Sequence, residues 1–124
     1  MSSVPIPPEG PECEWKVILP RLDRVARTLA AFANGVGGHL WVGITDDGRR
    51  VGVSDARQVL ADVRSASELC EPQPVLSLRR HRAGGVVLVE ARVKPTRPGP
   101  VGVTVDGAQR VFVRDGSSTR PAEE

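Results

Sequence analysis

The sequence is short of aromatic residues, and this excludes one class of binding surface. It has no tyrosine, two tryptophans and two phenylalanines among 124 residues. A surface that stacks several bases of a single strand needs a platform of aromatic side chains, so none is expected here. Aliphatic residues must supply the core, and one domain of this length can bury enough of them.

The sequence also lacks paired cysteines, long apolar runs and a leader. Cys13 and Cys70 lie far apart without a Cys-x-x-Cys pattern, which predicts reduced thiols in a cytoplasmic protein. The first residues show neither the basic start nor the apolar run of a signal peptide. No stretch approaches the roughly 20 apolar residues that a transmembrane helix needs. His39 and His81 lack the spacing of zinc ligands. We therefore expect no membrane association.

The sequence also has little excess of one sign of charge, since 17 basic and 15 acidic residues leave a formal net charge of +2. The distribution of charge is therefore more informative than its sum. Basic side chains gather in two segments, at Arg21, Arg24 and Arg27 and at residues 79–82. If residues 79–82 form a strand, the side chains of Arg80 and Arg82 point to one face of the sheet and those of Arg79 and His81 to the other. Such runs are typical either of a solvated face or of a groove that follows a phosphate backbone.

Hydrophobic periodicity divides the chain into a flexible proline-rich lead-in (1–11), one domain (12–120) and a short tail (121–124). Within the domain the predicted strands are 12–19, 38–44, 50–53, 75–82, 86–93, 101–105 and 110–114, and the predicted helices are 20–33 and 56–66. Ser54 or Asp55 is expected to cap the second helix. Asn34 and Gly35 are expected to end the first in a left-handed conformation. The predicted fold is α/β of the α+β type, a single mixed, largely antiparallel sheet covered by two helices.

Three carboxylates form a first candidate site. Glu14 lies on the first predicted strand, Asp46 follows the second, and Glu9 precedes the first. Clustered carboxylate oxygens bind Mg²⁺ or Mn²⁺, and such ions can clamp a scissile phosphate and activate water. The three converge only if the two strands are neighbours. Otherwise they are solvated surface acids, and the residues alone leave both interpretations open.

Two further segments contain groups that can bind phosphate. Residues 114–120 combine two guanidinium groups with three hydroxyls, including those of Ser117 and Ser118. They form either a phosphate contact or a solvated tail. The glycine-rich residues 34–38 follow a helix and precede a strand, the reverse of a phosphate-binding loop. We therefore interpret these glycines as structural.

Several motifs, in order, resemble those of the Schlafen-type, AlbA-like domain family. Glu14-Trp15-Lys16, with Glu9 upstream, resembles the family's opening, although Trp15 stands where phenylalanine is usual. Residues 31–44, AFANGVGGHLWVGI, resemble its central motif, and residues 112–119 resemble its closing segment. The likeness covers nearly the whole chain. An AAA label is sometimes attached to this family, but this sequence contains no Walker motif.

The resemblance implies an α+β fold and a nucleic-acid-binding role. Some members are metal-dependent endoribonucleases that act on structured RNA such as tRNA, and their metal-binding, catalytic carboxylates correspond by position to Glu9, Glu14 and Asp46. Lys16 and Arg114 would then contact phosphate. Nuclease members pair two lobes and this chain carries one, so a homodimer or a separate partner protein would supply the second.

The first functional hypothesis is a module that binds the phosphate backbone of RNA or DNA, in transcription regulation or RNA processing. Its expected phosphate contacts are Lys16, Arg21, Arg24, Arg80, Arg82, Arg114, Ser117 and Ser118. One alternative is an endoribonuclease acting on tRNA-like RNA, with Mg²⁺ or Mn²⁺ as its cofactor. The other is a protein-interaction or regulatory subunit. Only the nuclease requires a cofactor.

Overall fold

The structure is a computed structural model that describes residues 4–122. It contains two helices, α1 (Leu22–Asn34) and α2 (Ala56–Ser67). The strands are β1 (Cys13–Lys16), β2 (Gly38–Val42), β3 (Cys70–Glu71), β4 (Leu76–Ala83), β5 (Val86–Val93), β6 (Gly102–Val105), β7 (Ala108–Asp115) and β8 (Ser118–Pro121). The predicted α+β class, with mostly antiparallel pairing and two helices, is confirmed.

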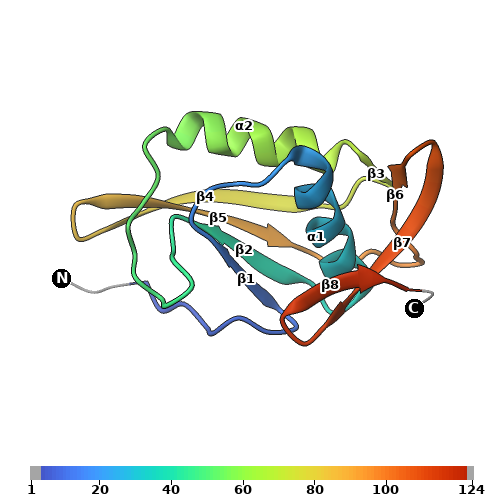
Figure 1. Ribbon diagram of the computed structural model, residues 1–124, viewed down its shortest axis with the longest axis horizontal. Helices are drawn as coiled ribbons and strands as arrows, with labels where there is room; N and C mark the ends of the chain where they lie inside the picture. The colour runs from blue at the N-terminus through green and yellow to red at the C-terminus, as the bar shows by residue number, and fades with distance from the viewer. Residues whose placement is uncertain (1–3, 123–124) are drawn as a thin grey trace.

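The strands form two sheets, so the expectation of a single sheet is wrong. The main sheet has the order β1-β2-β5-β4 with β1 and β2 parallel, and the second sheet has the order β3-β6-β7-β8. The link between β5 and β6 contains Pro95, Pro98 and Pro100. Proline lacks the N–H group that strand pairing requires, and the chain leaves the main sheet at this link. Figure 1 shows α1 between α2 and the β7–β8 hairpin.

Helix α1 is central to the hydrophobic core because it packs against both sheets. Its residues from Leu29 to Ala33 are completely buried, and they share one cluster with residues of α2 and of each sheet. Small alanine side chains allow this close approach from several sides. At the start of β2, a Cβ atom on Gly38 would lie 2.4 Å from the Phe32 ring. Only glycine therefore fits where the helix crosses this strand.

Neither α1 nor α2, the two helices within residues 4–122, covers the opposite face of the main sheet. Register places Cys13 beside His39 and Trp15 beside Trp41 on this face, while the alternate residues Glu14 and Lys16 face the helices. The lead-in covers part of the open face. Its Val4 and Ile6 pack against the cluster that contains Trp41, and the Trp15 Nε1–H donates to the Pro7 carbonyl at 3.1 Å.

Several boundaries differ from the predicted ones. Residues 50–53 form no strand in the structure. Ile44 and Arg50 make only an isolated bridge, and positive φ angles of 108° at Gly43 and 78° at Gly52 interrupt the extended backbone. Helix α1 ends at Asn34, but Gly35 has a φ of −103° and is not left-handed. The positive φ lies instead at Gly37 (89°). Strands β3 and β8 were not predicted.

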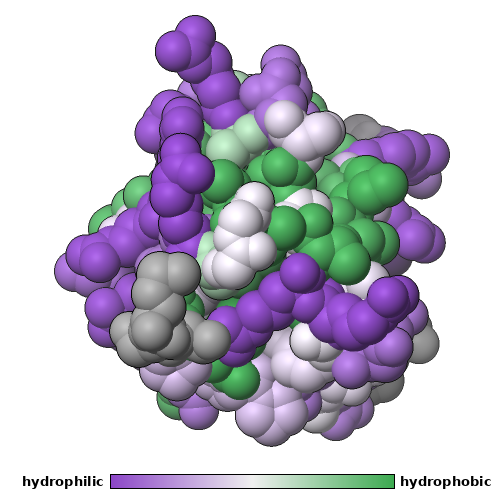
Figure 2. Space-filling model, turned by 90° about the vertical axis from the view of Figure 1, so that its left-hand side faces the viewer, coloured by the Kyte–Doolittle hydropathy of each residue, from purple (hydrophilic) through white to green (hydrophobic). Residues whose placement is uncertain are grey.

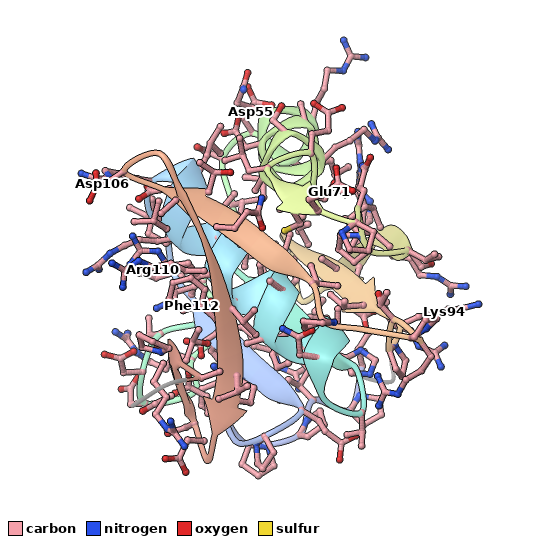
Figure 3. The ribbon with its side chains drawn as sticks, turned by 90° about the vertical axis from the view of Figure 1, so that its right-hand side faces the viewer. Asp55, Glu71, Lys94, Asp106, Arg110 and Phe112 are labelled. Atoms are coloured by element: carbon pink, nitrogen blue, oxygen red, sulfur yellow. The ribbon has the colours of Figure 1, made fainter. Side chains whose placement is uncertain are left out.

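The surface is mixed in character. At the end of the molecule where the β4–β5 hairpin turns, hydrophobic side chains occupy the middle of the face and hydrophilic ones surround them (Figure 2). Seen from the other end, Asp106 marks the tip of the β6–β7 hairpin, and Lys94 projects on the opposite side (Figure 3). Neither helix of the described chain is long and apolar enough to cross a bilayer.

Candidate functional site

A polar hollow of about 340 Å³ lies between β1, α1 and the β7–β8 hairpin. Its basic lining residues are Lys16, Arg24, Arg27 and Arg114. Its hydroxyl groups come from Thr28, Ser117, Ser118 and Thr119. The only carboxylate among its lining residues is Glu14. The hollow therefore concentrates positive charge and hydroxyl donors that are far apart in the sequence.

Regular geometry explains how these side chains meet. Glu14 and Lys16 are two residues apart on β1, so they point to the same face of the sheet, as the alternating pattern predicts. Because β1 is an edge strand, both lie at the border of the sheet. Arg24, Arg27 and Thr28 are three and four residues apart on α1 and therefore share one side of the helix. The turn between β7 and β8 brings in the serine hydroxyls.

Arg114 is the buried part of this site. Its side chain is only 4% exposed, and all four of its Nη–H groups have acceptors. Nη1 donates to Glu14 Oε1 at 2.9 Å and Thr119 Oγ1 at 3.0 Å, and Nη2 donates to the carbonyls of Gly10 (2.8 Å) and Cys13 (3.1 Å). Arg114 thus joins β7 to β1 and to the lead-in.

Glu14 is held between two cations. It is 8% exposed, and while Oε1 accepts from Arg114, Oε2 lies 3.3 Å from Lys16 Nζ. A buried carboxylate needs such partners because burial alone is unfavourable for its charge. One carboxylate does not balance four basic groups, so the hollow keeps an excess of positive charge.

The more exposed cations of the hollow remain accessible. The Lys16 side chain is 40% exposed, and Arg24 is exposed without an ion pair in the described part of the chain. Arg27 lies 3.5 Å from Asp23 at the adjacent helix turn, and its guanidinium is over the Phe112 ring at 5.2 Å from the centroid. These three side chains are available to an anion that enters from solvent.

The predicted carboxylate triad is only partly assembled. β1 and β2 are neighbours, and the pKa of Glu9 is raised by burial and then by the nearby carboxylates of Glu14 and Asp46. Glu9 Oε2, however, accepts the Trp15 N–H at 3.1 Å. Between residues 4 and 122, no three acidic, histidine or cysteine side chains are grouped closely enough to hold a metal ion. Within the described residues, the triad is therefore not assembled as a metal site.

Three other predicted phosphate contacts do not line the hollow. Arg21 donates to the Asp23 carboxylate at 3.0 and 3.1 Å, at the exposed start of α1. Arg80 and Arg82 lie on β4, at the opposite edge of the main sheet from β1. Two strands, β2 and β5, lie between β4 and β1, so these arginines are far from the hollow. The sequence did not reveal this strand order.

Three polar lining residues were missing from the expected phosphate contacts. Arg27 and Thr28 share a helix side with Arg24, so the three- and four-residue spacing could have indicated them. Thr119 follows Ser117 and Ser118 directly, but its inward position depends on the pairing of β8 with β7. That pairing had no clear signal in the sequence.

Comparison with known proteins identifies a family that the chain matches. The family described as Schlafen, AlbA_2 matches residues 9–123. The N-terminal domain of a RecG-related, ATP-dependent DNA helicase-like protein from Nitrosomonas europaea is similar, with a TM-score of 0.68 and 25% identity over 86% of this chain and 78% of that chain. No curated protein matches.

A second solved structure shares the fold. The DIP2311 protein from Corynebacterium diphtheriae has a TM-score of 0.62 and 22% identity over 90% of this chain. The match covers only 22% of that protein's length.

Proposed function

Because the chain belongs to the Schlafen, AlbA_2 family, we propose that it is a nucleic-acid-binding module whose hollow receives the phosphate backbone. The family association and the helicase-related neighbour support a link to nucleic acid. The chemistry of the hollow supports phosphate as the group that is bound. A role in RNA processing or transcription regulation, in the cytoplasm, is part of the proposal.

The observation that carries the proposal is the convergence of cations and hydroxyls from three separate elements. β1 supplies Lys16, and α1 supplies Arg24 and Arg27. The β7–β8 hairpin supplies Ser117 from its turn and Ser118 from the start of β8. Guanidinium groups and hydroxyls are common donors to phosphate oxygens, and such contacts position a protein on a backbone without reading its sequence. Few aromatic side chains are present to read bases by stacking.

Arg114 and Glu14 have a supporting role in this proposal. The guanidinium of Arg114 already donates to four protein oxygens, so it supplies positive potential and fixes the wall of the hollow. Glu14 orients Lys16 through their ion pair. A homodimer or a separate partner protein would extend the contact along a longer stretch of backbone.

The test is a binding measurement with tRNA and with duplex DNA on the wild type and on Lys16→Ala/Arg24→Ala. Because each lost phosphate contact removes about 1 kcal/mol, we expect the double variant, which loses two, to bind roughly thirtyfold more weakly. Arg57→Ala/Arg110→Ala removes the same charge outside the hollow and should bind within about twofold of wild type. Equal losses in both double variants would contradict the proposal.

The same samples separate binding from cleavage. The wild type and Glu14→Ala are each incubated with the nucleic acids, once with Mn²⁺ and once with EDTA. Intact RNA with a salt-sensitive mobility shift is the expected result. Discrete tRNA fragments that require both Mn²⁺ and Glu14 would instead show an endoribonuclease. Absence of any shift would favour a protein partner.

A further inference from the structure

The open face of the main sheet carries a polar cluster that the hollow does not use. Register brings His39 of β2, Glu90 of β5 and His81 of β4 onto this face. Glu90 Oε2 lies 2.5 Å from His39 Nδ1, and Glu90 Oε1 lies 2.8 Å from His81 Nε2. The Glu90 side chain is 12% exposed. One mostly buried carboxylate is therefore shared by two imidazoles.

Two arginines, Arg79 and Arg92, lie next to this cluster on the same face of the sheet. Arg79 pairs across the strands with Glu90, and Arg92 pairs with both His39 and Ser77. Together with Ser77, His39 and Glu90 they line a shallow hollow of about 150 Å³. Both arginines are exposed, and neither has an ion pair within residues 4–122. The face thus offers two free guanidinium groups, a hydroxyl and an imidazole to an anion.

The charge of this face depends on the two histidines. While both imidazoles are neutral, the two arginines and Glu90 leave one net positive charge. Histidine ordinarily titrates near pH ~6.5, and full protonation would raise the net charge to three, because Glu90 can balance only one cation. An anion bound between the arginines would then be held more strongly.

Neighbouring groups do not cancel this change. Burial raises the pKa of the Cys13 thiol, beside His39 on β1, to about 11, so it stays neutral. The Trp41 ring lies 5.0 Å from the His81 ring and is uncharged. Glu12, whose carbonyl accepts the His39 N–H, has its own side chain in solvent. Beyond Arg92, Lys94 adds a constant positive charge.

We propose that this open face is a second binding site for nucleic-acid phosphate, which strengthens when His39 and His81 become protonated. The ligand class rests on the proposed function, but the site itself is separate. Glu14 and Lys16 face the helices, whereas His39 and Glu90 lie on the other side of the sheet. The molecule would therefore contact phosphate on two opposite faces, and only the open face would respond to mild acid.

The experiment uses an oligothymidylate of about fifteen nucleotides without terminal phosphates. Neither thymine nor a phosphodiester titrates near neutral pH, so a change in affinity must come from the protein. Dissociation constants are measured by fluorescence anisotropy at about pH 5.5 and about pH 7.5, on either side of the histidine range. The proteins are the wild type, His39→Gln/His81→Gln, Arg79→Ala/Arg92→Ala and Lys16→Ala/Arg24→Ala.

We expect the wild type to bind roughly fivefold tighter or more at the lower pH, because two added charges act on one anion. This ratio should fall to about one in His39→Gln/His81→Gln, since glutamine keeps a donor but does not titrate in this range. The same loss is expected in Arg79→Ala/Arg92→Ala. Lys16→Ala/Arg24→Ala should bind more weakly at both pH values and keep the ratio.

A pH ratio that survives in the histidine variant and in the arginine variant would overturn the inference. The proposed function fails in a different way, through an unchanged affinity in Lys16→Ala/Arg24→Ala. Circular dichroism at both pH values verifies folding. Because Arg79 and Arg92 are exposed, their variant keeps the test decisive even if the histidine variant unfolds.

Discussion

Arg114 is the single residue on which the geometry of the hollow depends most. Its guanidinium is buried, donates to oxygens of four different residues, and lies over the Phe32 ring at 4.9 Å. A buried charge of this kind is tolerated only when its partners are in place. Arg114 therefore determines where Glu14 points, and Glu14 in turn determines where Lys16 points.

Replacing Arg114 should destabilise the whole domain. In Arg114→Met, Glu14 keeps only its longer contact with Lys16, and the carbonyls of Gly10 and Cys13 lose the Arg114 donor and keep only their mutual backbone hydrogen bonds. We expect the free energy of unfolding, measured by urea denaturation, to fall by about 3 kcal/mol. Arg110→Ala, on the same strand but exposed, should change it by less than about 0.5 kcal/mol. Similar losses in both variants would show that the buried contacts of Arg114 contribute no more to stability than an exposed arginine does.

At the scale of elements, α1 is the part that connects the two sheets, and Asn34 at its end makes the connection. The Asn34 Nδ2 donates to the carbonyls of Val101 and Phe112, each at 2.9 Å, and its Oδ1 accepts the Val101 N–H at 2.6 Å. One side chain thus satisfies three backbone groups, two of Val101, which precedes β6, and one of Phe112 on β7. It holds β7, and with it one wall of the hollow, against the helix.

Loss of this amide should loosen the second sheet. Asn34→Ala leaves three backbone groups without their partner, and partly buried polar groups are costly when unpaired. We expect a loss of about 2–3 kcal/mol in the free energy of unfolding. The control is Gln58→Ala, an exposed amide on α2 that bonds only Asp62 at 2.9 Å, where the expected change is below about 0.5 kcal/mol. Equal changes would argue against a connecting role.

The sequence predicted elements whose signal is local. Both helices and the β4–β5 hairpin follow from periodicity, and Asp55 caps α2 as one of the two expected residues, accepting the Gln58 N–H at 3.0 Å. The second sheet was not predicted as a separate sheet because β3 and β8 were missed, although the β6–β7 hairpin was expected. Cys70 of β3 pairs with Val103 of β6, and no local pattern marks a two-residue strand.

The same difference between local signals and long-range pairing applies to the candidate site. Lys16, Arg24 and Ser117 were expected to contact phosphate, and the structure brings them to one hollow. Arg80 and Arg82 have the same chemistry, but their strand lies at the far edge of the sheet. Residue type and spacing therefore predicted which groups could bind phosphate. Strand order, which arises from long-range pairing, determined which of them meet.

For the whole molecule, a formal net charge of +2 hides a strongly uneven distribution. The hollow holds four basic side chains and one carboxylate, whereas acidic residues such as Asp55, Glu71 and Asp106 lie outside it (Figure 3). Concentrated positive charge attracts a polyanion even when the total is small. Binding should therefore depend on the local cations and on the salt concentration.

The salt dependence measures how many phosphates the hollow engages. For single strands, the slope of the logarithm of the binding constant against the logarithm of salt concentration is about −0.7 per phosphate contact. Lys16, Arg24 and Arg27 are the accessible cations of the hollow, and we expect them to contribute about −2 to this slope for an oligothymidylate.

Lys16→Ala/Arg24→Ala should reduce the contribution of the hollow to about −0.7, because one of its accessible cations remains. Arg57→Ala/Arg110→Ala changes the total charge equally and should keep the wild-type slope. A lower affinity with an unchanged slope would mean that the two side chains act by shaping the protein. A reduced slope would show that they release counterions from the nucleic acid, and hence that the hollow itself contacts the backbone.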